Sequence, residues 1–282
     1  MIRFDRGREP EELARRRAAA LPDAIAMAQL HGVGSREHFA KLENYDQGKS
    51  ALHRAQGGKC AYCERFTPVD GNPLEHFRPK KGAIRADRSV DRAHYWWLCW
   101  TWENHVFACN TCNGQSRKGN RFHVERAMAT PNVSQAVPIP AEFFDWTAEN
   151  AALIDPATED PLDHLEWRPN ASTRRLSPKL WQWDICGLTA RGEATIAILQ
   201  LDANIDVVAA TIRNHVLPRV EAIRARGDAG ALADAREQWE RLLSDTVENP
   251  SSELRGPTWS ALQHLLAEVE RQRFGLRAAM RP

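Results

Sequence analysis

Apolar residues recur at helical spacing near the N-terminus, which predicts helices in this part of the chain. Pro10 is typical of a helix start, and the apolar face behind it consists of Leu13, Leu21, Ile25 and Leu30. The glycines within 32–35 end this helix, and a second helix is expected from about residue 36 to residue 54. We therefore expect an N-terminal helical segment over 1–50.

The middle of the chain, 51–126, shows shorter elements. Residues 74–77, with the sequence Leu-Glu-His-Phe, predict a short strand that ends at Pro79. The stretch 95–102 is dense in aromatic residues and predicts a buried helix. The alternative, in which these rings stack on nucleic-acid bases, fits so dense a cluster less well. A short helix over about 113–118 is expected to end at Gly119.

The remainder, 127–282, is predicted to be α+β at first and then helical. Residues 127–142 show no period and indicate a connecting segment, whereas 151–156 and 164–167 predict two short strands. From about Gly192 onward, apolar residues repeat at helical spacing, which predicts helices. The periodic positions are Ile205, Val208, Ile212, Val216, Val220, Leu232, Ala235, Trp239, Leu242, Trp259, Leu262, Leu266 and Val269.

Composition narrows the class of protein without identifying it. The 282 residues are 43% hydrophobic and 27% charged, which is typical of a soluble globular protein. No run approaches the ~20 apolar residues of a membrane-spanning helix, and the charged N-terminus lacks the apolar core of a signal peptide. We therefore expect a cytoplasmic protein with no membrane partner.

Positive charge is concentrated between residues 76 and 126. This stretch carries ten Lys and Arg against four Asp and Glu, although the net charge of the whole chain is only +1. Such a patch attracts phosphate groups, with an ordinary solvated face as the alternative. Arg78 and Lys80, next to the predicted strand, are candidate contacts to a phosphate backbone.

Two C-x-x-C pairs are the most informative feature of the composition. The first motif consists of Cys60 and Cys63, and the second of Cys109 and Cys112. A reducing cytosol argues against disulfides, a redox motif needs only one pair, and four thiolates suit a structural Zn²⁺ ion. The 45 residues between the pairs exceed the ~15–20 of a simple zinc ribbon, so they must hold structure of their own.

Four polar residues around these pairs have the side chains that a metal-dependent nuclease needs. They are Glu75, His76, Asn104 and Asn113. A neutral histidine deprotonates water, Glu and Asn oxygens bind a hard divalent cation, and a further polar group orients the histidine. The structural alternatives are a helix cap for Asn104 and an N-cap for Asn113.

The same residues carry a resemblance to a known family. The pattern CAYCE…EHFRPK…WEN-x-x-x-x-C-x-x-CN-x-x-x-x-KG resembles the HNH endonucleases. More narrowly, it is similar to the HNH subunits of Septu-type anti-phage systems and their retron-linked relatives. The stretches ALIDPATEDPLDHLEW and GEATIAILQLD extend this similarity over roughly residues 45–205. The resemblance implies an SMC/ABC-like ATPase as a partner, which is expected to dock on the helices from about Gly192 onward.

The resemblance also implies a role for each motif residue. His76 is the general base, Glu75 and Asn113 are ligands of the catalytic metal, and Asn104 braces the loop that carries the base. The last position is often His in the family, and Asn113 here favours Mg²⁺ or Mn²⁺ because a carboxamide offers oxygen. Lys118 follows the family pattern as a substrate contact. The remaining implied ligands, those of the structural zinc, are Cys60, Cys63, Cys109 and Cys112.

The sequence thus predicts an α+β, mostly helical protein with a zinc-stabilised ββα-metal (HNH) nuclease core over 51–126. Its expected activity is divalent-metal-dependent hydrolysis of phosphodiester bonds, in DNA rather than RNA, as the effector of a defence complex. One alternative is an RNA nuclease with the same site, acting for instance on tRNA, because the scissile phosphate is common to both nucleic acids. The other alternative is a zinc-stabilised module that binds nucleic acid or protein without cleaving it.

Overall fold

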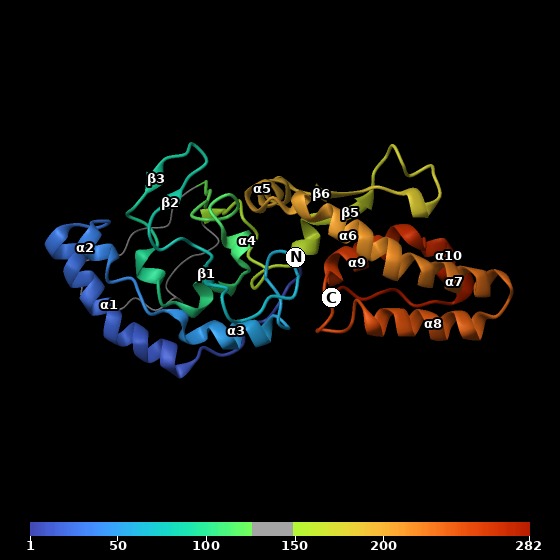
Figure 1. The fold of residues 1–282 in the computed structure, drawn as a ribbon, viewed down its shortest axis with the longest axis horizontal. Coiled ribbons are helices and arrows are strands. Elements are labelled where there is room, and N and C mark those ends of the chain that lie inside the picture. Colours follow the sequence, from blue (N-terminus) through green and yellow to red (C-terminus); the bar gives the residue numbers. More distant parts are fainter. Residues whose placement is uncertain (126–148) are drawn as a thin grey trace. The chain divides into compact units, whose positions relative to one another are not determined.

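The structure is a computed structural model that describes residues 1–125 and 149–282. The described residues form two units (Figure 1). The N-terminal unit consists of Phe4–Ala61 and Phe66–Ala157, and the C-terminal unit of Met1–Arg3, Tyr62–Arg65 and Thr158–Pro282. The fold is α+β, as predicted, and about half helical. The predicted connecting segment 127–142 lies outside the described residues, and the division at residues 50 and 126 stays a prediction.

The N-terminal unit begins with helices and continues with short strands. Its elements are α1 (Glu11–His31), α2 (Arg36–Phe39), η1 (Asp46–Gly48), α3 (Lys49–Ala55), β1 (Leu74–His76), β2 (Ala83–Ile84), β3 (Val90–Asp91), η2 (Trp96–Leu98), η3 (Trp102–Asn104), β4 (His105–Phe107) and α4 (Asn110–Asn113). Helix α1 begins after Pro10 and ends before Gly32, so this prediction is confirmed, although Leu30 of the predicted apolar face is 71% exposed and lies outside the core.

A loop interrupts the second predicted helix, and the prediction of one helix over 36–54 is wrong. Within this loop Asn44 adopts the left-handed conformation with a φ of 54°, which ends helical continuation. The carbonyl oxygen of Glu43 accepts a hydrogen bond from the indole nitrogen of Trp100 at 3.1 Å instead of serving a helix. The chain is therefore not helical between α2, which ends at Phe39, and η1, which begins at Asp46.

Strands β1 and β4 form an antiparallel pair in which His76 lies opposite His105. Strand β1 confirms the strand predicted at residues 74–77. Helix α4 follows β4 and begins at Cys109, whose sulfur accepts a hydrogen bond from the backbone nitrogen of Cys112 at 3.4 Å. Because this cap fixes the helix start, α4 covers Asn110–Asn113, and the helix predicted over 113–118 is wrong.

The aromatic stretch 95–102 lies in the core, but it is not one α-helix. Tyr95 has a φ of 70°, and two 3-10 helices, η2 and η3, replace the predicted helix. The Cys99 carbonyl oxygen accepts hydrogen bonds from the His76 and His105 side chains, and the Leu98 carbonyl accepts one from the Asn104 side chain besides its 3-10 bond from the Thr101 nitrogen. The tryptophans Trp96, Trp97, Trp100 and Trp102 are all buried, which supports the core interpretation.

The C-terminal unit combines one strand pair with several helices. Its elements are η6 (Pro161–Asp163), β5 (Leu165–Pro169), η7 (Pro178–Leu180), β6 (Trp183–Gly187), α5 (Ala190–Leu199), η8 (Leu201–Asn204), α6 (Ile205–Thr211), the π-helix η9 (Ile212–Val216), α7 (Leu217–Asp228), α8 (Leu232–Asp245), α9 (Arg255–Leu265) and α10 (Glu268–Phe274). The helical periodicity from residue 205 onward is confirmed, although Val269 is 76% exposed and lies outside the core.

Strand β5 confirms the strand predicted at 164–167, and its antiparallel partner is β6. The strand predicted at 151–156 is wrong, because the Asp155 carboxylate accepts a hydrogen bond from the backbone nitrogen of Ala157 at 3.0 Å and turns the chain. On α9, the Ser260 hydroxyl bonds both the nitrogen and the carbonyl oxygen of Trp167 at 2.9 Å. These bonds fix α9 against β5.

Among the described residues, no single helix has the length and apolar composition needed to cross a membrane. One bent pair, Ala190–Leu199 with Leu201–Asp228, passes that test only when its two members are taken together.

Candidate active site

A cleft of about 510 Å³ in the N-terminal unit collects three of the four predicted catalytic residues, Glu75, His76 and Asn113. The other lining residues are Tyr45, Pro73, Leu74, Pro79, Lys80, Lys81, Ile84, Gln115, Gly119, Asn120 and Arg121. Glu75 and His76 reach the cleft from β1, and Asn113 reaches it from the end of α4. Carboxylate and imidazole groups from one strand and a carboxamide group from a helix thus line the same cleft.

The hydrogen bonds of His76 define which of its nitrogens can act as a base. Its Nε2 lies 2.8 Å from the carbonyl oxygen of Cys99, and a carbonyl oxygen only accepts, so Nε2 carries the proton. The lone pair is therefore on Nδ1, which lies 3.3 Å from the Nζ of Lys80. Burial lowers the pKa of His76 well below its ordinary value, and the positive charge of Lys80 acts in the same direction. The ring is thus a neutral imidazole with a basic nitrogen at the cleft.

His105 supports the same carbonyl from the opposite strand. Its Nε2 lies 2.9 Å from the Cys99 oxygen, and its ring centroid is 4.8 Å from that of His76 in an edge-to-face arrangement. Burial lowers the pKa of His105 to about 3. Two neutral histidines therefore share one acceptor, and His105 does not line the cleft.

Glu75 forms a buried ion pair with Lys118. The ammonium group of Lys118 also donates to the carbonyl oxygen of His76 at 2.8 Å, and its side chain is fully buried. Burial raises the pKa of the Glu75 carboxyl, and the nearby Lys118 charge opposes that rise. Lys118 was predicted to contact substrate, but its side chain faces the protein interior. There it bonds the Glu75 carboxylate and the His76 carbonyl of β1.

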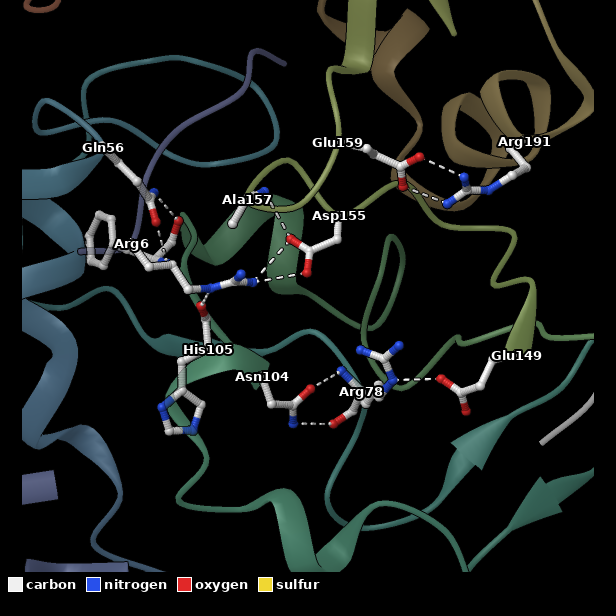
Figure 2. A network of polar contacts seen from close by, with 11 residues as sticks. Arg6, Gln56, Arg78, Asn104, His105, Glu149, Asp155, Ala157, Glu159 and Arg191 are labelled. Atoms are coloured by element: carbon white, nitrogen blue, oxygen red, sulfur yellow. Dashed lines mark hydrogen bonds and ion pairs between the residues drawn. The ribbon is translucent and has the colours of Figure 1, made fainter. Parts of the chain in front are cut away.

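Asn104 lies behind the cleft and contacts the chain that follows β1. Its Oδ1 accepts a hydrogen bond from the backbone nitrogen of Arg78 at 2.8 Å, and its Nδ2 donates to the Arg78 carbonyl at 3.0 Å (Figure 2). The Arg78 guanidinium pairs with the buried Glu149 at 2.6 Å, also drawn in Figure 2. Arg78 therefore does not line the cleft, and of the three predicted phosphate contacts only Lys80 does.

The four cysteines of the two C-x-x-C pairs form a separate cluster. The sulfur atoms of Cys60, Cys63, Cys109 and Cys112 all lie within 4.8 Å of one another. This donor set fits a tetrahedral metal such as zinc, which thiolates bind at about 2.3 Å. The Arg117 guanidinium lies 3.9 Å from the Cys112 sulfur and favours the charged thiolate form.

Several residues at the site were not foreseen from the sequence. Tyr45, Lys81 and Arg121 line the cleft, and Glu149 anchors Arg78. Tyr45 lies in an irregular loop about 30 residues before β1, where no periodic pattern or motif spacing marks it. Lys81 and Arg121 belong to the basic stretch that the charge count detected, but charge alone does not show which of its members face the cleft.

Because Lys118 forms a buried ion pair, its substitution is expected to destabilise the folded protein. Substitution of a surface residue that only contacts substrate would not. We expect Lys118→Met to lower the free energy of unfolding by about 3–5 kcal/mol, because it leaves the buried Glu75 without its partner. Urea unfolding measures this loss. In a Glu75→Gln background the same change is expected to cost much less, and exposed Lys81→Met is expected to stay within about 0.5 kcal/mol of the native chain. Equal costs in both backgrounds would show that the pair does not exist.

Comparison with known proteins supports the Septu and retron HNH-type family, as the motif resemblance predicted. The chain is 34% identical to Septu protein PtuB of Bacillus mycoides (strain KBAB4) over 122 residues, which are 43% of this chain and 38% of that protein. It is 32% identical over 84 residues to a Vibrio cholerae serotype O1 biovar El Tor protein named as a candidate HNH endonuclease of retron Vc95, covering 27% of this chain and 36% of that protein.

The matched part spans less than two fifths of the length of either curated relative. No family model matches the chain, and no solved structure matches it significantly. The ββα-metal assignment therefore rests on the order β1, β4, α4 and on the motif, and stays a prediction.

Proposed function

We propose that this protein is a divalent-metal-dependent HNH endonuclease that hydrolyses phosphodiester bonds in DNA. The observation that carries the proposal is the meeting of Glu75, His76 and Asn113 at one cleft, with the unprotonated Nδ1 of His76 directed to Lys80 at its surface. Relatives of the Septu and retron HNH type support the same activity.

The residues of the cleft supply a base and a place for the phosphate. A water molecule that replaces the Lys80 ammonium beside Nδ1 gives its proton to His76 as its oxygen attacks phosphorus, and the bond to the leaving oxygen breaks. The Cys99 carbonyl stays bonded to Nε2 and stabilises the resulting imidazolium. The displaced ammonium of Lys80, together with Lys81 and Arg121, faces the phosphate from the cleft wall.

Glu75 and Asn113 would hold the catalytic metal, because both offer oxygen ligands of the kind that Mg²⁺ and Mn²⁺ prefer. When bound, such an ion neutralises charge that develops on the phosphoryl and leaving oxygens. Lys118 occupies one oxygen of the Glu75 carboxylate and leaves the other for a ligand role. Asn104 and Arg78 act through the backbone by fixing the chain after β1.

In the cell, we propose that this nuclease is the effector of an anti-phage defence complex in the cytoplasm. The partner would be an SMC/ABC-like ATPase that docks on the C-terminal helices from about Gly192 onward. Similarity to a Septu protein supports this assignment. An RNA nuclease with the same site is the second candidate, because the basic cleft faces a phosphate group that both nucleic acids share.

Plasmid cleavage by the purified full-length chain tests the proposed activity. We expect nicking that requires added Mg²⁺ or Mn²⁺ and stops when EDTA is present in excess over that metal. The control is a zinc measurement, which ensures that the loss does not come from the cysteine cluster. Absence of cleavage of both DNA and RNA, with the chain alone and with the ATPase, would refute the nuclease assignment.

A further inference from the structure

A second hollow of about 430 Å³ adjoins the active-site cleft in the same unit. The two hollows share five lining residues, which are Tyr45, Pro73, Leu74, Lys80 and Lys81. The residues that line only the second hollow are Leu42, Glu43, Asn44, Asp46 and Lys49. A ligand that occupies the cleft can therefore continue into the second hollow past a common wall.

Tyr45 and Lys80 form the part of this wall that is closest to the base. The Nζ of Lys80 lies 3.7 Å from the centroid of the Tyr45 ring, and that ring lies 4.5 Å from the His76 ring at an angle of 69°. Tyr45 is half-buried and comes from an irregular loop, so its ring is not part of the hydrophobic core. An aromatic ring and a cation thus border both hollows within contact distance of the catalytic histidine.

We propose that the second hollow is a subsite for one unpaired nucleotide next to the scissile phosphate. Its base would stack on Tyr45, and its phosphate would contact Lys80 and Lys81. The volume lies within the range of about 300–1,000 Å³ that is common for small-ligand sites. This inference rests on the proposed function, since it places the nucleotide beside the phosphate that His76 attacks.

The lining chemistry favours a nucleotide over an anion alone. Glu43 and Asp46 offer carboxylate oxygens that accept hydrogen bonds from the amino groups of bases but repel a bare phosphate. Lysines on the shared wall supply the positive charge that the phosphate requires. In a duplex the face of each base is stacked on its neighbours, so Tyr45 can receive only a base that has left the stack. The substrate class is therefore single-stranded or locally unpaired nucleic acid.

Binding without cleavage tests the subsite directly. The probe is a fluorescent single strand of about 12 nucleotides, as DNA and as RNA, and the same DNA sequence as a blunt duplex. Anisotropy is measured with the full chain in buffer free of Mg²⁺ and Mn²⁺. We expect Tyr45→Leu to weaken single-strand binding about 5- to 150-fold, which corresponds to a lost stacking energy of about 1–3 kcal/mol. Duplex affinity is expected to stay unchanged.

Matched variants separate stacking from a general loss of structure. Tyr45→Phe keeps the ring and is expected to bind within about twofold of the native chain. Phe66→Leu removes an aromatic ring that is 55% exposed and lines neither hollow, and it should have no effect. The subsite would be overturned if Tyr45→Leu bound the single strand as tightly as the native chain does. It would also be overturned if the variant lost affinity equally for the single strand and the duplex. Comparing the DNA and RNA probes shows which sugar the subsite prefers.

The binding experiment also separates this inference from the proposed function. If Tyr45→Leu weakens single-strand binding but the native chain hydrolyses no phosphodiester with metal present, the nucleotide site stands and the nuclease assignment fails. If the native chain cleaves nucleic acid and Tyr45→Leu binds single strands as the native chain does, the nuclease assignment stands and the subsite fails.

Discussion

His76→Ala is expected to slow phosphodiester cleavage by about 100- to 10,000-fold, the contribution that a positioned general base makes. The variant lacks Nδ1, and no other described side chain places an unprotonated nitrogen at the same point of the cleft. The fold should survive, because the Cys99 carbonyl keeps its hydrogen bond from His105 at 2.9 Å. Initial rates of plasmid nicking at saturating Mg²⁺ or Mn²⁺ measure the loss.

A second histidine supplies the control for this substitution. His53 is half-buried, bonds the Thr67 carbonyl oxygen at 3.0 Å and lies outside the cleft. We expect His53→Ala to cleave at nearly the native rate, and both variants to retain zinc. A His76→Ala protein that stays folded, holds zinc and cleaves normally would remove His76 from the mechanism and show that another group acts as the base.

Local motifs predicted which residues meet in the cysteine cluster and at the cleft, because the spacing of these motifs is set by short-range geometry. A C-x-x-C turn brings two sulfurs together whatever surrounds it, so the cysteine cluster was predictable from residue order alone. Glu75 and His76 are adjacent on a strand. Asn113 follows the last cysteine directly. These residues reach one cleft because β1, β4 and α4 are consecutive parts of one small structure.

The parts that sequence reasoning missed depend on contacts between distant segments. Lys118 was predicted to contact substrate, but it lies 43 residues from the carboxylate that it pairs with, and only the fold shows that pairing. Glu149 lies 71 residues from Arg78. The stretch 95–102 has helical composition, yet it forms only 3-10 turns, and its Leu98 and Cys99 carbonyl groups accept hydrogen bonds from the side chains of Asn104, His76 and His105. Tertiary hydrogen bonds here override local propensity.

Removal of the metal that the cysteine cluster would hold is expected to unfold the two C-x-x-C pairs and helix α4 together. Cys109 caps α4 and Cys112 lies within it, so the thiolates that would bind zinc also fix the position of Asn113. The first pair is tied to β4 by the hydrogen bond from the Ala61 nitrogen to the Phe107 carbonyl at 3.0 Å. Loss of the ion would therefore disturb both strands and helix.

Cys112→Ser tests this dependence. Structural zinc sites contribute apparent binding free energies on the order of 10 kcal/mol, comparable to the stability of a whole domain. We expect the variant to lose bound zinc, its cooperative thermal transition and all cleavage, whereas His76→Ala loses cleavage alone. Cys186→Ser is the control, because Cys186 is half-exposed on β6 and lies outside the cluster. A Cys112→Ser protein that keeps one zinc ion and a native melting temperature would contradict a structural role, because it would show that the three remaining sulfurs do not need the fourth to hold the ion.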